Sequence, residues 1–156
     1  MQTHGIAFMT AAAILFVGIG ESLADQRLIQ AAKKQDSTAV RALVKQKGVN
    51  VNAADGDGAT PLLWAAQWDD AEMARALIAA GAKVDVANEY GVTPLSMAAT
   101  NGSVVMVDAL LAAGADPNLA QPSGQSPLMT ASLTGRVAPV KSLLAKGARV
   151  DARDSY

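Results

Sequence analysis

The chain has 156 residues, which is room for one domain or for one linear array of small units. Hydrophobic residues make up 51% of it but aromatic residues only 4%, and this balance favours a core of closely packed helices. Cysteine is absent, so disulfides, thiolate nucleophiles and Cys-ligated metal sites are excluded. The 13 basic and 14 acidic residues leave a formal net charge of -1.

Charge is unevenly distributed along the chain. Residues 25–54 include six basic and two acidic residues, residues 55–116 include two basic and nine acidic, and residues 117–156 include five basic and two acidic. A protein that binds a polyanion usually presents a continuous basic face, and the acidic middle of this chain would interrupt it. Nucleic acid is therefore not an expected partner.

The N-terminal segment has the pattern of an export leader. Its apolar stretch, Ile6 to Ile19, has about 14 residues, fewer than the roughly 20 that span a bilayer. Ser22-Leu23-Ala24 then fits the small-x-small cleavage pattern. We expect residues 1–24 to be a signal peptide cleaved after Ala24, giving a periplasmic or secreted protein with no membrane attachment. Because residues 1–4 lack Lys and Arg, an uncleaved membrane anchor or a misplaced start codon is the alternative.

An internal repeat is the strongest signal in the chain. Two series of glycines recur every 33 residues: Gly58, Gly91 and Gly124, and Gly48, Gly81, Gly114 and Gly147. The first series lies in three related segments, DGDGATPL, NEYGVTPL and QPSGQSPL, which begin at residues 55, 88 and 121. Such a register is not a chance product, so the chain is built from units of this length.

Each unit predicts a pair of helices. A Thr or Ser precedes a Pro, and these residue types favour the N-cap and the first helical position, so helices are expected to start at Pro61, Pro94 and Pro127. A second helix is predicted where apolar residues recur at three- and four-residue spacing, as at Met106, Val107, Leu110 and Leu111. It should end at a glycine of the second series, which can adopt the left-handed conformation.

These motifs resemble the ankyrin repeat, a unit of about 33 residues that opens with G-x-T-P-L, carries a central A-A pair and ends with L-L-x-x-G-A-D-V-N. The resemblance implies an all-α repeat solenoid of helix-turn-helix units joined by β-hairpin-like loops. It gives regular units at 55–87 and 88–120, an irregular unit at 121–153 and a degenerate, basic N-terminal capping unit at 25–54. Residues 154–156 occupy the opening positions of a further unit, and we interpret the chain as truncated there.

Two departures from the family pattern have structural consequences. The His that usually follows Thr-Pro-Leu is replaced by Leu63, Ser96 and Met129, so its hydrogen bonds must be made by other groups or be missing. Pro139 lies in the first turn of the second helix of the third unit, where a proline is tolerated but is expected to delay the helix start. The third unit should therefore be the least regular.

The residues needed for catalysis are scarce. His4 is the only histidine and would leave with the leader, which excludes Ser-His-Asp or Cys-His catalysis and a typical zinc site in the mature chain. Asp55-Gly56-Asp57-Gly58 has the look of a calcium loop, but Ala66 occupies the twelfth position, where an EF-hand needs Glu. We therefore expect no catalytic residue, no cofactor and no metal. A carboxylate-dependent hydrolase is the least favoured alternative.

The resemblance implies that a partner protein binds the concave side, formed by the hairpin tips and the inner face of the first helices. The positions that carry over as partner-binding are Asp57, Gln67, Trp68, Glu89, Tyr90, Val92, Asn101, Ser123, Gln125 and Leu133. Trp68 and Tyr90 are the strongest candidates, because truncation of large amphipathic side chains at interfaces commonly costs about 2 kcal/mol or more. The alternatives are that Trp68 packs against Trp64 and that Tyr90 is a solvated loop residue.

Acidic residues lie near these positions: Asp57, Asp69, Asp70 and Glu89. They would form a rim that favours a basic partner, although an ordinary solvated face is the simpler interpretation. The sequence thus predicts a monomeric, non-enzymatic protein-protein interaction scaffold in a bacterial-type envelope. A secreted effector that acts on host proteins is the alternative, and it would use the same binding chemistry.

Overall fold

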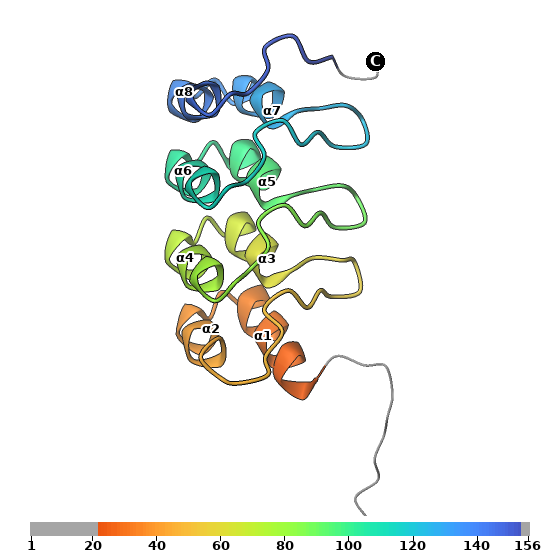
Figure 1. Cartoon of the computed structure of the whole chain (residues 1–156), viewed down its shortest axis with the longest axis vertical. Coiled ribbons are helices and arrows are strands. Elements are labelled where there is room, and N and C mark those ends of the chain that lie inside the picture. The colour runs from red at the N-terminus through yellow and green to blue at the C-terminus, as the bar shows by residue number, and fades with distance from the viewer. Residues whose placement is uncertain (1–21, 154–156) are drawn as a thin grey trace, which may run out of the picture.

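The computed structural model describes residues 22–153, and these residues form eight short helices arranged as four stacked pairs (Figure 1). The helices are α1 (Leu23–Lys33), α2 (Ser37–Leu43), α3 (Pro61–Gln67), α4 (Ala71–Ala79), α5 (Pro94–Asn101), α6 (Val104–Ala112), α7 (Pro127–Leu133) and α8 (Val137–Ala145). No strand occurs within this range, so the predicted all-α repeat architecture is confirmed. Most of the predicted leader, residues 1–21, and the start of a further unit at 154–156 lie outside the described residues.

The helices form two rows. The inner row consists of α1, α3, α5 and α7, the outer row consists of α2, α4, α6 and α8, and each helix packs on its neighbours in the same row and on its pair mate. Long loops project from the inner row (Figure 1). We call the inner row together with the tips of these loops the inner face; it corresponds to the predicted concave side.

Local capping determines where the inner helices start. Thr60, Thr93 and Ser126 have extended backbones, and each side-chain oxygen accepts the backbone N–H three residues later, at 3.3, 3.1 and 3.2 Å. Proline follows each of them at the first helical position, where no N–H is needed. The three predicted helix starts are therefore confirmed.

The outer helices keep the same register, with starts at residues 71, 104 and 137. The expectation that Pro139 delays the start of α8 is therefore wrong. Pro139 is the third residue of that helix, and the first turn of a helix makes no intrahelical N–H bond that a proline would break. The irregularity lies one step earlier: Asp70 and Ser103 cap α4 and α6, whereas Arg136 makes no side-chain cap.

One hydrophobic core runs through the stack from Leu28 to Ala148. Alanine pairs on the inner helices are fully buried in the first two regular repeats, and such small side chains let neighbouring helices approach closely. Between residues 22 and 153, no helix has the length and apolar character needed to cross a membrane.

The hairpin loops are closed by backbone bonds and contact one another. In the first two, the Oδ1 atoms of Asp55 and Asn88 each accept two backbone N–H groups, whereas Gln121 occupies this position in the third. The tips of the first two loops are joined by the Glu89 N–H, which donates to the Asp57 carbonyl at 3.0 Å. Gly91 has a φ of +75°, and a Cβ there would lie 2.2 Å from Cδ of Pro122 in the next loop. Only glycine fits this contact.

In two of the three repeats, another side chain makes a hydrogen bond at the turn where the family histidine is missing. The Ser96 hydroxyl oxygen accepts the Thr93 N–H at 2.9 Å, and the Met129 sulfur accepts the Ser126 N–H at 3.4 Å. Leu63 has no polar atom for this purpose. The hydrogen bond at this turn therefore comes from a hydroxyl in one repeat and from a weak sulfur acceptor in another.

Side-chain amides also link successive repeats through the loops that follow the outer helices. Asn52 and Asn118 each accept a backbone N–H, at 2.7 and 2.8 Å, and each donates to the carbonyl of the glycine that ends the next outer helix, at 3.3 and 3.1 Å. Asp85 holds the equivalent position between them. Its carboxylate accepts the Asp116 N–H at 3.2 and 3.3 Å, but it has no proton to donate.

The first helix is fixed by a buried carboxylate. Ser22 and Asp25 form a capping box at the start of α1, and Asp25 also accepts the Asn50 N–H at 2.7 Å. Burial raises the pKa of Asp25, but these hydrogen bonds from Asn50 and Ser22 outweigh it and hold the pKa below its ordinary value. Asp25 thereby joins α1 to the loop that precedes the first regular repeat.

Candidate protein-binding face

The ten predicted partner-binding residues lie in two rows on the inner face. One row follows the hairpin tips and contains Asp57, Glu89, Tyr90, Val92, Ser123 and Gln125. The other follows the C-terminal ends of the inner helices and contains Gln67, Trp68, Asn101 and Leu133. Three large side chains among them are well exposed: Tyr90 at 69%, Trp68 at 40% and Leu133 at 79%.

Trp68 and Asn101 have a structural role that the sequence reasoning missed. They occupy equivalent positions 33 residues apart, and each donates to the end of the preceding inner helix. The Trp68 indole N–H donates to the Ala32 carbonyl at 3.2 Å, and the Asn101 amide donates to the Ala66 carbonyl at 3.0 Å. Each of these carbonyls also accepts a backbone N–H of the turn, from Gln35 at 3.1 Å and from Asp69 at 3.2 Å, so the side chain adds a second hydrogen bond that links two repeats.

Trp68 also packs against Trp64, as the alternative interpretation of this residue held. Their ring centroids are 6.4 Å apart with an angle of 27° between the planes, and the Lys33 ammonium lies 5.0 Å from the centroid of the Trp64 ring. Stacked aromatic pairs and cation–π contacts restrict ring motion. Because Trp68 is nevertheless 40% exposed, packing and partner binding do not exclude each other.

Asp55 holds this aromatic pair in place. One carboxylate oxygen accepts the Lys33 ammonium at 3.0 Å and the Trp64 indole N–H at 3.2 Å, and the other accepts the Asp57 and Ala59 N–H groups at 3.1 and 3.0 Å. Burial raises the pKa of Asp55, but the bonds from Lys33 and from the two backbone groups outweigh it and hold the pKa below its ordinary value. A role in the repeat turn thus accounts for Asp55, as the sequence indicated.

The acidic residues near this face divide into two kinds. Asp70 caps α4 and accepts the Ser37 hydroxyl, so its role is structural. The side chains of Asp57, Asp69 and Glu89 are exposed and make no hydrogen bond or ion pair with other residues in the range 22–153. The acidic rim is therefore reduced to these three carboxylates.

A pocket of about 400 Å³ opens among α5, α7 and the third hairpin loop. Its lining contains the predicted residues Gln125 and Leu133, together with Thr100, Gln121, Thr130 and Thr134. No charged side chain lines it. Register alone would have placed Thr100 and Thr134 beside the selected positions, whereas the pocket itself depends on how α5 and α7 are spaced.

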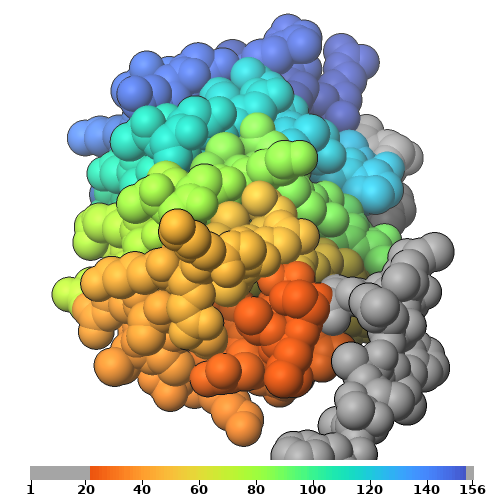
Figure 2. Space-filling model, turned by 60° about the horizontal axis from the view of Figure 1, so that its bottom comes forward, coloured from red at the N-terminus to blue at the C-terminus, as the bar shows by residue number. Residues whose placement is uncertain are grey.

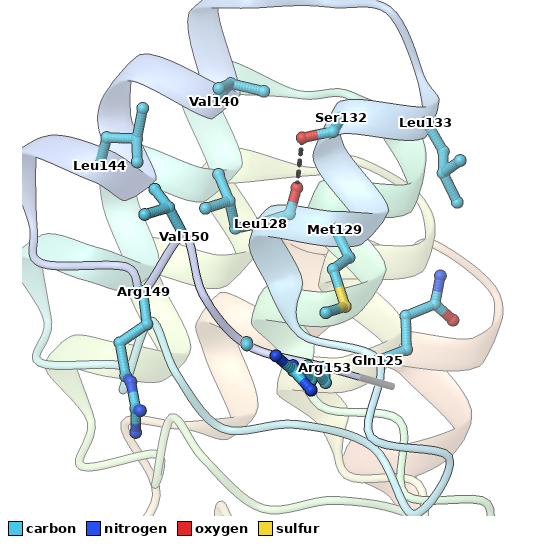
Figure 3. A pocket seen from close by; sticks show the side chains of 11 residues that line it. Gln125, Leu128, Met129, Ser132, Leu133, Val140, Leu144, Arg149, Val150 and Arg153 are labelled. Carbon is cyan, nitrogen blue, oxygen red and sulfur yellow. Dashed lines mark hydrogen bonds between the residues drawn. The ribbon is translucent and has the colours of Figure 1, made fainter. Parts of the chain in front are cut away.

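A larger groove opens on the end face of the third repeat (Figure 3). It measures about 820 Å³ and is lined by apolar side chains such as Leu128, Leu144 and Val150, with Arg149 and Arg153 at its edge. In the first two regular repeats the residue equivalent to Leu128 is fully covered by the following repeat. This groove is therefore the stacking surface of the third repeat, and it meets the inner face at Gln125 and Leu133, which line it as well.

The opposite end of the stack is formed by α1 and α2 (Figure 2). Of its basic residues, Lys33 pairs with Asp55, and Arg41 pairs with Glu72 at 3.1 Å. The remaining basic side chains there are exposed: Arg27, Lys34, Lys45 and Lys47. The degenerate first unit thus presents the polar outer surface that a terminal repeat needs.

Within residues 22–153, no three His, Cys, Asp or Glu side chains are grouped so that they could hold a metal ion.

A family model described as "Ankyrin repeats (3 copies)" matches residues 28–121 and 84–154. Comparison with curated proteins gave no match. The two matched ranges cover most of the chain, from the middle of α1 to beyond α8. The chain therefore belongs to the ankyrin repeat family, whose members are generally protein-protein interaction modules and are typically not enzymes.

Proposed function

We propose that this chain is a non-catalytic, monomeric scaffold that binds a partner protein through its inner face, with Trp68 and Tyr90 as anchors. The observation that carries the proposal is that both aromatic side chains are exposed at positions where the fold does not require them. Asn101 makes the equivalent of the Trp68 bond with an amide, and Asp57 and Ser123 hold the position of Tyr90 in the other loops. Buried aromatic anchors dominate binding energy at interfaces.

Both anchors are also presented by structure that is already ordered. The Tyr90 N–H and the Val92 N–H donate to Asn88, which fixes the loop, and Trp68 is held by its indole bond and by Trp64. A surface that is rigid before association loses less conformational entropy on binding. This supports a preformed binding face.

The equivalent residues of other repeats supply the test. Trp68→Asn introduces the donor of the next repeat, whose equivalent acceptor is the Lys33 carbonyl, and Tyr90→Ser introduces the residue of the third loop, so both variants should fold normally. A partner captured from envelope proteins by the wild type is purified, and its affinity for the double variant is measured. The truncation cost of about 2 kcal/mol per anchor corresponds to roughly thirtyfold weaker binding for each. Val105→Asn, exposed on α6 of the outer row, is the control and should bind like the wild type. Equal affinity of the double variant would remove the proposed face.

We also propose that the protein is exported, with residues 1–24 as its leader. The proposal is supported by the apolar stretch and the small-x-small pattern that ends at Ala24. Expression from the natural start in a bacterial host, followed by N-terminal sequencing of each fraction, tests it. A periplasmic product that begins at Asp25 is expected, whereas an intact Met1 in the soluble cytosolic fraction would contradict export.

A further inference from the structure

The pocket between α5 and α7 has a defined hydrogen-bonding character. Its three threonine hydroxyls all use their protons within their own helices. Thr100 donates to the Ser96 carbonyl at 2.9 Å, Thr130 to the Ser126 carbonyl at 3.2 Å, and Thr134 to the Ala131 carbonyl at 2.7 Å. A hydroxyl has one proton and two lone pairs, so these groups offer only lone pairs to a ligand. Thr134 has one fewer, because it accepts the Arg136 N–H at 3.3 Å.

The rest of the lining suits a ligand with several donors and an aliphatic stem. The side-chain amides of Gln121 and Gln125 make no hydrogen bond with other described residues, so their carbonyl oxygens are available as acceptors. Leu133, which is 79% exposed, supplies apolar surface at the pocket edge. Thr130 is the buried member of the set, with 7% exposure.

Electrostatics at this place favour a cation. Thr100 and Thr134 lie at the C-terminal ends of α5 and α7, where the helix dipole is negative. The unpaired carboxylates of Asp57 and Glu89 lie on the same face, at the tips of the first and second hairpins, whereas most of the pocket lining belongs to residues 117–156, which include five basic and two acidic residues. The pocket offers an anion no charged partner and no hydroxyl proton, only the amide N–H groups of Gln121 and Gln125.

We propose that this pocket binds an arginine side chain of the partner protein. The inference rests on the proposed function, since it names the chemistry that the inner face recognises. A guanidinium group carries five N–H donors in a plane, enough to reach several of the acceptors at once, and its stem packs on Leu133. Lysine has three donors on a compact, strongly hydrated ammonium, so it fits a set of separated acceptors less well.

The side chain of Arg136, two residues after Thr134, does not fill the pocket. The Arg136 side chain lies over Gly102, where its Cδ would be 2.4 Å from a Cβ, and Arg136 is not among the residues that line the pocket. Its charge opposes a second cation nearby. Removing it with Arg136→Ala should therefore leave binding of an arginine unchanged or strengthen it.

The experiment titrates three probe peptides into the full chain labelled with nitrogen-15. The probes are acetyl-Gly-Gly-Arg-Gly-Gly-amide and the same peptide with lysine or with citrulline in place of arginine. The arginine peptide should shift the amide resonances around Thr100, Thr130 and Leu133 and bind at least about fivefold more tightly than the citrulline peptide, which lacks the charge. It should also bind more tightly than the lysine peptide.

Substitutions of the lining threonines test whether the arginine peptide binds in this pocket. Thr100→Val and Thr130→Val remove acceptors at nearly constant shape, and together they should weaken binding of the arginine peptide by at least about fivefold. Thr38→Val, exposed on α2, is the matched control and should have no effect. If the buried Thr130→Val change perturbs the fold, the exposed Thr100→Val variant alone should still weaken binding.

Three results would overturn the proposal: equal affinity for the arginine and citrulline peptides, unchanged affinity in Thr100→Val, or shifts confined to the loops of Asp57 and Glu89. Loss of partner binding in the Trp68/Tyr90 double variant together with any of these results would leave the proposed function standing without the arginine pocket. Partner binding that survives that double variant would instead refute the proposed face, whatever the peptides do.

Discussion

Asp85→Asn should stabilise the stack. At the equivalent positions, Asn52 and Asn118 accept one backbone N–H and donate to one glycine carbonyl, whereas the Asp85 carboxylate can only accept. An asparagine there gains a donor toward the Gly114 carbonyl. A hydrogen bond contributes about 0.5–1.5 kcal/mol net, so we expect a gain of about 1 kcal/mol. The reverse change, Asn118→Asp, should cost a similar amount.

The assay is urea unfolding followed by circular dichroism at neutral pH. With a slope of about 2 kcal/mol per molar urea, a change of about 1 kcal/mol moves the midpoint by about 0.5 M. Asp108→Asn on α6 is the control, because it removes the same charge from an exposed side chain that makes no hydrogen bond within the described residues. An Asp85→Asn midpoint no higher than that of Asp108→Asn would refute the reasoning, since the gain would then come from charge alone.

Three further predictions concern stability. Gly91→Ala should lower the free energy of unfolding in urea by about 3 kcal/mol, because it combines left-handed backbone strain with a clash against the Pro122 ring in the next loop. Gly114→Ala is the control: its Cβ meets nothing within 4 Å, so it should lower that free energy by only about 1 kcal/mol. Equal losses in the two variants would contradict the Pro122 contact. Arg136→Ser should raise stability by about 1 kcal/mol by giving α8 the cap that Ser103 gives α6, and an unchanged melting temperature would count against it. The pKa of Asp55 is depressed in the folded state, so its carboxylate stabilises the fold above the unfolded pKa of about 3.9, and this stabilisation is lost as the pH falls. Asp55→Asn should therefore show a smaller fall of the urea midpoint in acid than the wild type. Parallel plots of midpoint against pH for the two proteins would exclude this contribution.

The helix boundaries were predictable because their causes are local. A Thr-Pro or Ser-Pro pair provides the cap and the first residue of an inner helix within two positions, and a left-handed glycine follows each outer helix of the three regular-length repeats. Pro139 was judged by the same local logic and the prediction was wrong. The start of α8 follows the register that its neighbours in the outer row impose, and a proline in the first turn breaks no bond there.

The binding face was predictable in position but not in detail. Register placed Trp68 and Tyr90 on the inner face, yet the indole bond from Trp68 to Ala32 spans two repeats and depends on their spacing. Likewise, the sequence could not show that Asp70 is used as a cap and as an acceptor for Ser37, or that threonine protons are used within the helices beside the pocket. These are properties of packing between repeats, which a pattern within one repeat does not contain.

The first turn of α1 sets an order of events for an exported chain. Leu23 and Ala24 are helical, so the proposed cleavage point after Ala24 lies inside a folded turn, next to the buried Asp25 carboxylate that holds Asn50. A protease needs a locally unfolded substrate. Cleavage after Ala24 would therefore require this turn to be open, and it would remove Ser22, Leu23 and Ala24, so the capping box exists only before processing. In a chain cleaved there, Asp25 becomes the N-terminal residue and keeps the bond from the Asn50 N–H.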